Sequence, residues 1–276
     1  MDAQRGGPST GLPTKTEQSD LLFAMYGRNG ESPMPIVAAA TPSDCFDAAL
    51  EASRIALEHM VPVLLLTDGY MANGAEPWLI PDADAIPPIK HRLTTEHNNP
   101  DGDYLPYRRD PETLARSWAV PGTPGLEHRV GGLEKQDETG HVSYDPDNHQ
   151  LMTNIRQEKV DRIANYIPEL EAFGSDSGTL VLGWGSTYGA IRQAVVAAQA
   201  RGWKVAHAHL RHLNPFPRNL GDLLRQYDRV LIPEMNMGQL NKLIRAKYLI
   251  DAVSLPKVTG QPFKVQEILA AIDANQ

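Results

Sequence analysis

The chain has 276 residues, of which 41% are hydrophobic and 22% are charged, proportions typical of a globular protein that buries a core. Its net charge of -8 excludes the basic surface of a nucleic-acid-binding domain and disfavours an anionic membrane, and no apolar run reaches the roughly 20 residues of a membrane span. A single cysteine, Cys45, excludes an intrachain disulfide and a four-thiolate iron–sulfur site in this chain, so we expect a cytoplasmic protein.

The first segment, residues 4–14, is rich in Gly, Pro and hydroxyl side chains, and residues 17–26 have helical spacing. Arg5 in this loop can hold a carboxylate by two parallel hydrogen bonds. The hydroxyls of Ser9, Thr10 and Thr14 could bind the rest of an organic acid. An ordinary capping loop would have the same composition, so the residue types alone leave both interpretations open.

A strand–helix–strand unit follows. We expect strands at 35–40 and 61–66, and between them a helix with Thr41 as its N-cap and Pro42 at its first position. Two continuous apolar strands joined by a helix favour a parallel sheet that is buried on both faces. Cys45 lies in the first turns of this helix with no visible base nearby, and we interpret it as a buried structural residue.

From residue 76 to residue 149 periodicity disappears, which indicates a functional loop region or an excursion between domains. Helical spacing returns over residues 150–173, and we expect Arg156, Lys159 and Arg162 on a solvated face.

In the last hundred residues, short apolar runs typical of strands alternate with segments of helical spacing. We expect strands at 179–182, 204–210 and 229–232, and helices at 187–199, 217–226, 239–248 and 265–272. Such alternation favours right-handed crossovers onto a mostly parallel sheet.

The glycines of the second half and the histidines of the chain are two further candidates for a ligand site. The glycines of residues 183–189 follow a strand and precede a helix, but Tyr188 stands where the third glycine of a dinucleotide fingerprint belongs. They fit a tight turn with close helix–strand packing, while a phosphate or partner contact stays open. The nine histidines show no metalloprotease spacing and no supporting thiols, so we expect surface or core imidazoles and no metal site.

Four motifs carry a family resemblance: QRGGPSTGLPTKTEQSDLL, PVLLLTDGYMANG, PGTPGLEH and PEMNMGQL. They resemble the α subunit of 2-oxoacid:ferredoxin oxidoreductases, most closely the 2-oxoglutarate type, and the resemblance runs over essentially the whole chain. It implies an α/β fold: a partial thiamine-diphosphate pyrimidine-type domain followed by a transketolase C-terminal-like α/β domain. We expect these at 1–95 and 176–276, with an irregular excursion and linker helix at 96–175 between them.

The resemblance also implies the chemistry. Arg5 falls on the arginine that binds the 2-oxoacid carboxylate, Thr14 falls on the threonine that positions substrate, and Ser9 and Thr10 would line the same pocket. The implied reaction is oxidative decarboxylation of a 2-oxoacid, with electrons passed singly to an iron–sulfur cluster and the acyl group passed to coenzyme A.

The upstream half-domain of such α subunits has no counterpart here, so the resemblance implies an N-terminally incomplete chain that is inactive alone. Thiamine diphosphate, Mg²⁺ and the iron–sulfur cluster would be held mainly by a partner β subunit, and ferredoxin would accept the electrons. The alternative is a non-catalytic assembly or binding module that keeps an α/β nucleotide-binding-like domain for partner contact.

Overall fold

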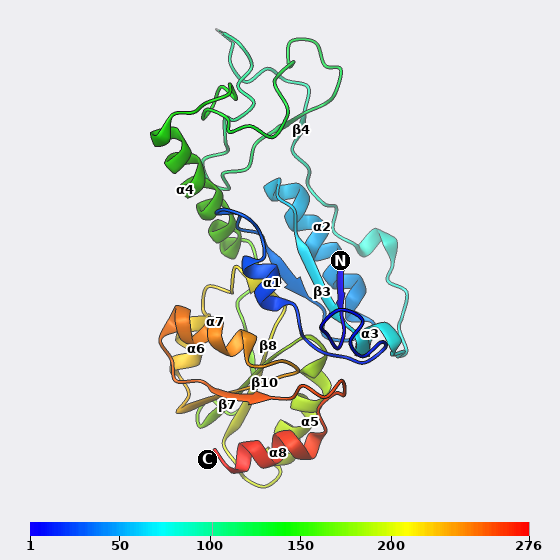
Figure 1. Ribbon diagram of the computed structural model, residues 1–276. Coiled ribbons are helices and arrows are strands. Elements are labelled where there is room, and N and C mark those ends of the chain that lie inside the picture. Colours follow the sequence, from blue (N-terminus) through cyan, green and yellow to red (C-terminus); the bar gives the residue numbers. More distant parts are fainter. Residues whose placement is uncertain (101, 276) are drawn as a thin grey trace.

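The computed structural model describes residues 1–100 and 102–275, which form two mainly parallel sheets (Figure 1). The first sheet has the strand order β1-β3-β2-β9, made by Asp2–Gln4, Leu64–Asp68, Ile36–Ala38 and His212–Asn214. β1, β3 and β2 are parallel, and β9 runs antiparallel to β2. The carboxyl ends of β1 and β3 therefore lie together at one edge of this sheet.

The second sheet has the order β11-β10-β7-β8-β6, with β7 at its centre. These strands are Val253–Pro256, Arg229–Glu234, Thr179–Trp184, Val205–Leu210 and Ala172–Gly174. Helices cover both faces, as the continuous burial of β7 requires: α5 (Tyr188–Gln199) and α8 (Val265–Asp273) pack on one side, α6 (Leu220–Arg225) and α7 (Gln239–Tyr248) on the other.

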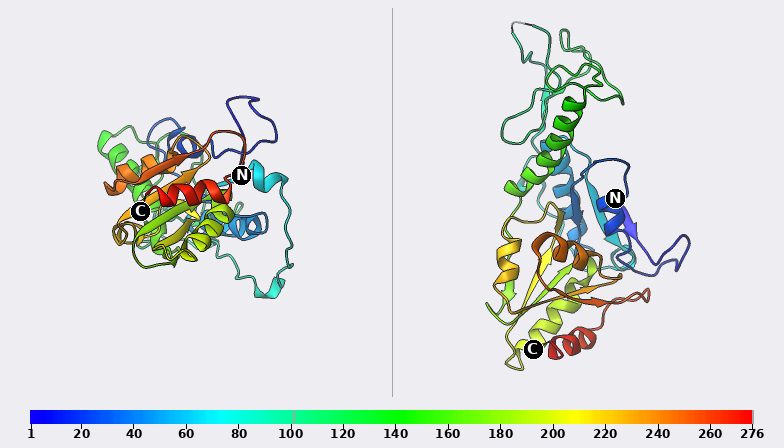
Figure 2. Two further views of the ribbon diagram at one scale, coloured as in Figure 1. Left: turned by 90° about the horizontal axis from the view of Figure 1, so that it is seen from below. Right: turned by 60° about the vertical axis from the view of Figure 1, so that its left-hand side comes forward.

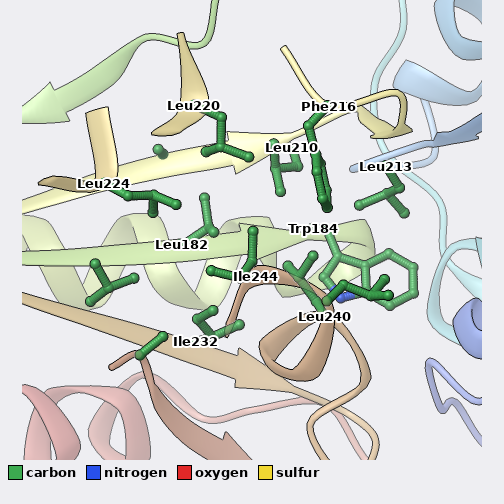
Figure 3. Close-up of a cluster of buried hydrophobic side chains, with 14 of the residues drawn as sticks. Leu182, Trp184, Leu210, Leu213, Phe216, Leu220, Leu224, Ile232, Leu240 and Ile244 are labelled. Carbon is green, nitrogen blue, oxygen red and sulfur yellow. The ribbon is translucent and has the colours of Figure 1, made fainter. Parts of the chain in front are cut away.

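A single hydrophobic cluster joins the two sheets. Trp184, at the carboxyl end of β7, is fully buried beside Leu240 of α7 (Figure 3). Leu66 of β3 and Ile36 of β2 belong to the same cluster. The chain also passes directly from β8 in the second sheet through Arg211 to β9 in the first, so the two sheets share both core and connection.

Helix α2 (Asp44–His59) connects β2 to β3, as the strand–helix–strand pattern predicts. It begins three residues after the expected N-cap, yet the Thr41 hydroxyl still accepts a hydrogen bond from the Asp44 backbone N–H at 3.3 Å. Ala48 and Ile55 bury its apolar face against the first sheet.

The irregular segment, residues 74–145 apart from residue 101, first runs beside α2 and then projects beyond the first sheet on the side away from the second sheet (Figures 1 and 2). It contains one short 3₁₀ turn, Ala83–Ala85, and a two-strand pair made by β4 (Leu93–Thr94) and β5 (Trp118–Ala119). Helix α4 (Pro146–Arg162) leads back from it, with Asp145 capping its first turn. Within the described residues, no helix is long and apolar enough to cross a membrane.

Three expected helices are clearly shorter than predicted, and one of them is α6, which spans Leu220–Arg225 instead of 217–226. Helical spacing suggested 150–173, but α4 ends at Arg162, a 3₁₀ turn covers Ile163–Asn165, and Phe173 lies in β6. Pro168 prevents this helix from continuing to residue 173, because proline lacks a backbone donor and disfavours helix at the residue before it. Helix α1 spans only Leu21–Tyr26, because the backbone before it bonds to the second sheet.

Candidate functional site

The segment that carries the predicted site residues, residues 5–15, forms a closed loop at the carboxyl end of β1. We call it the Arg5 loop. The backbone N–H of Gly6 donates to the Lys15 carbonyl at 2.9 Å, and the N–H of Leu12 donates to the Gly6 carbonyl at 2.9 Å. The Glu17 carboxylate accepts from the Gly7 N–H at 3.4 Å. These bonds fix the base of the loop, while its tip projects from the molecule (Figure 2).

Glycine is required at one position of this loop. Gly11 has a φ of +46°, and a Cβ there would lie 2.1 Å from the Gly6 carbonyl oxygen, which is inside van der Waals contact with backbone that cannot move aside. The closure at Gly6 and Leu12 thus depends on a residue without a side chain.

All four predicted side chains, Arg5, Ser9, Thr10 and Thr14, are exposed on this one loop. The Arg5 Nη1 donates to the Thr10 carbonyl at 2.6 Å. A guanidinium has five N–H donors, so this bond orients the group and leaves donors for a carboxylate. Ser9 and Thr14 have positive φ values of 53° and 65°. A β-branched residue in this region is strained, and strain of this kind gathers at ligand sites.

Below the loop lies a buried acid that the sequence interpretation did not identify. Asp68, at the carboxyl end of β3, is 1% exposed. Its carboxylate accepts hydrogen bonds from the Thr16 hydroxyl at 3.1 Å and from the backbone N–H groups of Tyr70 and Ser186 at 3.0 and 3.2 Å. Asp68 thereby caps helix α3 (Gly69–Asn73) and joins the first sheet to the turn after β7.

Gln18 makes a second connection between the segment after the Arg5 loop and the second sheet. Its Nε2 donates to the Trp184 carbonyl at 2.8 Å, and its Oε1 accepts from the Met235 backbone N–H at 2.8 Å. Its backbone N–H donates to the Met235 carbonyl at 3.0 Å. The chain that leaves the Arg5 loop is thus held by the carboxyl ends of β7 and β10.

The motif PEMNMGQL contributes a buried carboxylate at the start of α7. Glu234 accepts from the backbone N–H groups of Leu240 and Asn241 at 2.7 and 3.0 Å and from the Trp184 indole at 3.2 Å. Burial raises the pKa of Glu234 above its usual value, although these bonds oppose the shift. This acid joins α7 to β7 and β10. The amino-acid sequence of the motif does not indicate this structural role.

A glycine near the carboxyl end of β7 allows close packing between strand and helix, as expected. A Cβ on Gly183 would lie 2.5 Å from Cδ1 of Ile191, so the helix and the strand approach here as only glycine permits. His209 Nε2 lies 3.0 Å from the Gly185 carbonyl, and His207 Nε2 lies 3.3 Å from His209 Nδ1. Burial, followed by the charge of Arg192, lowers the pKa of His207 to about 3, and burial also lowers the pKa of His209. Both imidazoles are therefore neutral, His207 in the core and His209 half-buried.

Cys45 is half-buried, and its thiol donates to the Thr41 carbonyl at 3.4 Å. Burial, aided by Asp44, raises the pKa of the Cys45 thiol, which makes it a poor nucleophile.

A thiamine diphosphate pyrophosphate needs a divalent cation, and the described residues do not fit that part of the cofactor. In residues 1–100 and 102–275, no group of three or more His, Cys, Asp and Glu side chains is placed to hold a metal ion. Of the acids beside the Arg5 loop, Glu17 accepts from the Gly7 N–H, and Asp68 has both oxygens hydrogen-bonded within the fold.

Two domain families match the chain. The family described as pyruvate flavodoxin/ferredoxin oxidoreductase, thiamine-diphosphate-binding, matches residues 1–145, and core domain II of pyruvate:ferredoxin oxidoreductase matches residues 178–268. These matches confirm the expected fold class, a domain of the thiamine-diphosphate-binding type followed by a second α/β domain.

The chain is similar to curated proteins over nearly its whole length. It is 56% identical over 270 residues to the 2-oxoglutarate oxidoreductase subunit KorA of Mycobacterium tuberculosis, covering 97% of this chain and 40% of that protein. It is 32% identical to the α subunit of 2-oxoacid:ferredoxin oxidoreductase 1 of Aeropyrum pernix, covering 98% and 43%. The chain thus spans about two fifths of the length of these relatives.

Among solved structures, the fold matches a 2-oxoglutarate:ferredoxin oxidoreductase from Magnetococcus marinus with 2-oxoglutarate, coenzyme A and succinyl-CoA bound. The TM-score is 0.89 at 31% identity, and the match covers 99% of this chain and 48% of that one.

Proposed function

Because the chain belongs to the pyruvate flavodoxin/ferredoxin oxidoreductase family and resembles its 2-oxoacid:ferredoxin oxidoreductase α subunits throughout, we propose that it is the α-subunit portion of a 2-oxoglutarate:ferredoxin oxidoreductase. In this proposal the assembled enzyme decarboxylates a 2-oxoacid oxidatively and forms the acyl-coenzyme A. The chain contributes the substrate-binding loop and is inactive without its partner.

One observation carries the proposal: the Arg5 loop is fixed at its base and exposed at its tip. Ligands of open α/β sheets bind beyond the carboxyl ends of parallel strands, which is where β1 delivers Arg5. An exposed guanidinium on an anchored loop is suited to a site that a second subunit completes. The strain at Thr14 is of the kind that binding sites retain.

Within that site, this chain's residues bind and orient the substrate. Arg5 holds the carboxylate of the 2-oxoacid by paired N–H bonds, and its positive charge stabilises negative charge that develops nearby. Its bond to the Thr10 carbonyl limits how the guanidinium can turn. Ser9, Thr10 and Thr14 border the same anion, and the Thr14 hydroxyl donates to it.

The cofactors belong to the complex. Since the described residues do not form a pyrophosphate and Mg²⁺ site, we assign thiamine diphosphate, Mg²⁺ and the iron–sulfur cluster mainly to the partner β subunit. Ferredoxin is the proposed electron acceptor and coenzyme A the acyl acceptor, in the cytoplasm.

We divide the chain for this role into a pyrimidine-type half-domain at 1–95, an excursion with a linker helix at 96–175, and a transketolase C-terminal-like domain at 176–276. The buried bonds of Asp68 and Gln18 give the second α/β unit a part in holding the loop.

The test is co-purification with the β subunit of the proposed enzyme, followed by thiamine-dependent reduction of a viologen dye. The panel is 2-oxoglutarate, pyruvate and a branched 2-oxoacid. We expect a stable complex that reduces the dye with 2-oxoglutarate and loses this activity when either subunit is omitted. A stable complex that turns over none of the acids would contradict the proposal and favour a non-catalytic assembly module.

A further inference from the structure

A second site of positive charge lies far along the chain from the Arg5 loop. A cavity of about 380 Å³ opens between the irregular segment and helix α4. Five cationic side chains line it, together with one carboxylate, Glu134: they are Arg109, Arg116, Lys135, Arg156 and Lys159.

Two of the five cations have partners. Arg156 Nη1 lies 3.5 Å from the Glu134 carboxylate, and Arg109 is paired with Asp137. In the described part of the chain, the other three have no carboxylate within 4.0 Å. An excess of three positive charges therefore remains at the cavity.

These three cations form hydrogen bonds only with backbone carbonyls, and the Arg116 guanidinium also lies 4.0 Å from the centre of the Tyr107 ring. Arg116 Nη1 donates to the Pro106 carbonyl at 3.2 Å, Lys135 Nζ to the Gly131 carbonyl at 2.9 Å, and Lys159 Nζ to the Met60 carbonyl at 2.9 Å. Such bonds satisfy donors but do not neutralise charge. Lys135 is only 3% exposed, so water cannot screen it fully.

The pKa of Lys159 shows that these positive charges destabilise one another. The sequence interpretation placed Arg156, Lys159 and Arg162 on a solvated face of the helix. This is wrong for Lys159, which is half-buried and lines the cavity, whereas the Arg156 side chain is 38% exposed. Burial, followed by the nearby charges of Arg116 and Arg109, lowers the pKa of Lys159 to about 8. Burial also lowers the pKa of Arg116. An anion in the cavity would reverse both effects.

We propose that this cavity is a binding site for the phosphate group of a small molecule, held by Arg116, Lys135 and Lys159. Three uncompensated charges favour a phosphate or diphosphate over a carboxylate, because a phosphate monoester carries nearly two negative charges and three acceptor oxygens. Gly131 and Gly132 line the same cavity with no heavy atom within 4 Å of where a Cβ would be, which leaves room for the ligand.

None of the residues of the Arg5 loop lines this cavity, so the inference does not depend on the proposed function. An acidic segment of a partner protein is the competing occupant. Lys135 is almost wholly covered, so a side chain of a partner protein would have difficulty reaching it. A small anion inside the cavity is therefore the favoured occupant.

The test is isothermal titration of the full chain with inorganic pyrophosphate, phosphate and acetate at matched ionic strength. We expect pyrophosphate to bind more tightly than phosphate, and acetate to bind least. Lys135→Gln and Lys159→Gln should each weaken pyrophosphate binding at least roughly tenfold, the scale of one charge-assisted hydrogen bond. Lys159→Arg, which keeps the charge, should retain more affinity than Lys159→Gln.

The matched control is Lys242→Gln, at an exposed lysine of α7 far from the cavity, and it should bind pyrophosphate as the unaltered chain does. Lys159→Gln is informative even if Lys135→Gln does not fold, because Lys159 is only half-buried. Absence of pyrophosphate binding, or equal affinity for acetate, would overturn the proposal. Full affinity of Lys159→Gln for pyrophosphate would overturn it as well.

Discussion

At the scale of single residues, the proposed substrate site depends on a loop whose side chains are close in sequence. Arg5 and Thr10 are five residues apart and already in contact. Ser9 and Thr14 are held with positive φ by closing bonds at Gly6 and Leu12. Such left-handed conformations cost about 1–3 kcal/mol each, so the anchors below the loop must stabilise it.

The Thr14 hydroxyl should contribute to substrate binding in the assembled enzyme. Thr14→Val keeps the β-branched shape and removes one donor, so we expect kcat/KM for the 2-oxoacid to fall roughly 3- to 10-fold, the range of one hydrogen bond. Thr14→Ser, which keeps the hydroxyl, should stay close to the unaltered enzyme in steady-state assays. Equal kinetics for the Val and Ser variants would remove Thr14 from the site.

The Arg5 loop could be predicted because its residues are contiguous, whereas the residues that support it could not. Asp68 binds Ser186, which is 118 positions away, and Gln18 binds Met235, which is 217 positions away. No local pattern encodes such pairs. Lys159 was assigned to solvent for the same reason, since its neighbours come from the irregular segment, whose path has no periodicity.

At the scale of elements, a charged contact joins helix α2 to strand β9, which follows directly after β8 of the second sheet. Glu51 accepts from His212 of β9 at 2.8 Å and from Arg54 at 2.7 Å. Burial alone would raise the pKa of Glu51, but these hydrogen bonds outweigh it and lower the pKa from 4.5 to about 2. The contact thus fixes α2 against the strand that enters from the second sheet.

This pKa predicts how stability depends on pH. A carboxyl whose pKa is lower in the folded chain stabilises the fold above pH 4.5, and that stability is lost as the pH falls toward 2. We expect up to roughly 3 kcal/mol from Glu51. Urea titrations from about pH 5 to about pH 3 should therefore show a shallower loss of stability for Glu51→Gln than for the unaltered chain.

The control for this pH dependence is Glu169→Gln, at an exposed acid between α4 and β6. It should leave the slope of stability against pH unchanged. Parallel pH profiles for Glu51→Gln and the unaltered chain would contradict the assigned role of Glu51.

Elements with a strong pattern were predicted, and short edge strands were not. Helix α2 and strand β7 have long periodic or apolar runs. β1, β9 and β11 have three or four residues each, too few for alternation to show, and their pairing depends on distant partners. Of these, β1 matters most, because it delivers Arg5 to the edge of the sheet.

At the scale of the whole molecule, the two sheets behave as one cooperative unit. Leu66 and Ile36 of the first sheet lie in the same hydrophobic cluster as Trp184 of the second. Gln18 adds two buried side-chain hydrogen bonds between them. We therefore expect one calorimetric unfolding transition rather than one for each sheet.

Gln18→Ala should lower the free energy of unfolding by about 3 kcal/mol, because it leaves the Trp184 carbonyl and the Met235 N–H buried without partners. Gln150→Ala, at an exposed position of α4, is the control and should change stability by less than about 0.5 kcal/mol. Two separate transitions in the unaltered chain, or no difference between these variants, would contradict the shared junction.

The most direct measurement is kcat/KM for 2-oxoglutarate in the complex with the β subunit, comparing Arg5→Ala with Arg201→Ala, an exposed arginine after α5. We predict that Arg5→Ala loses roughly 100-fold, about 3 kcal/mol of transition-state stabilisation, while Arg201→Ala keeps full activity. Arg5→Lys should recover only part of the loss, since an ammonium cannot make the paired bonds. Full activity in Arg5→Ala, with the complex intact, would show that this guanidinium does not bind the substrate.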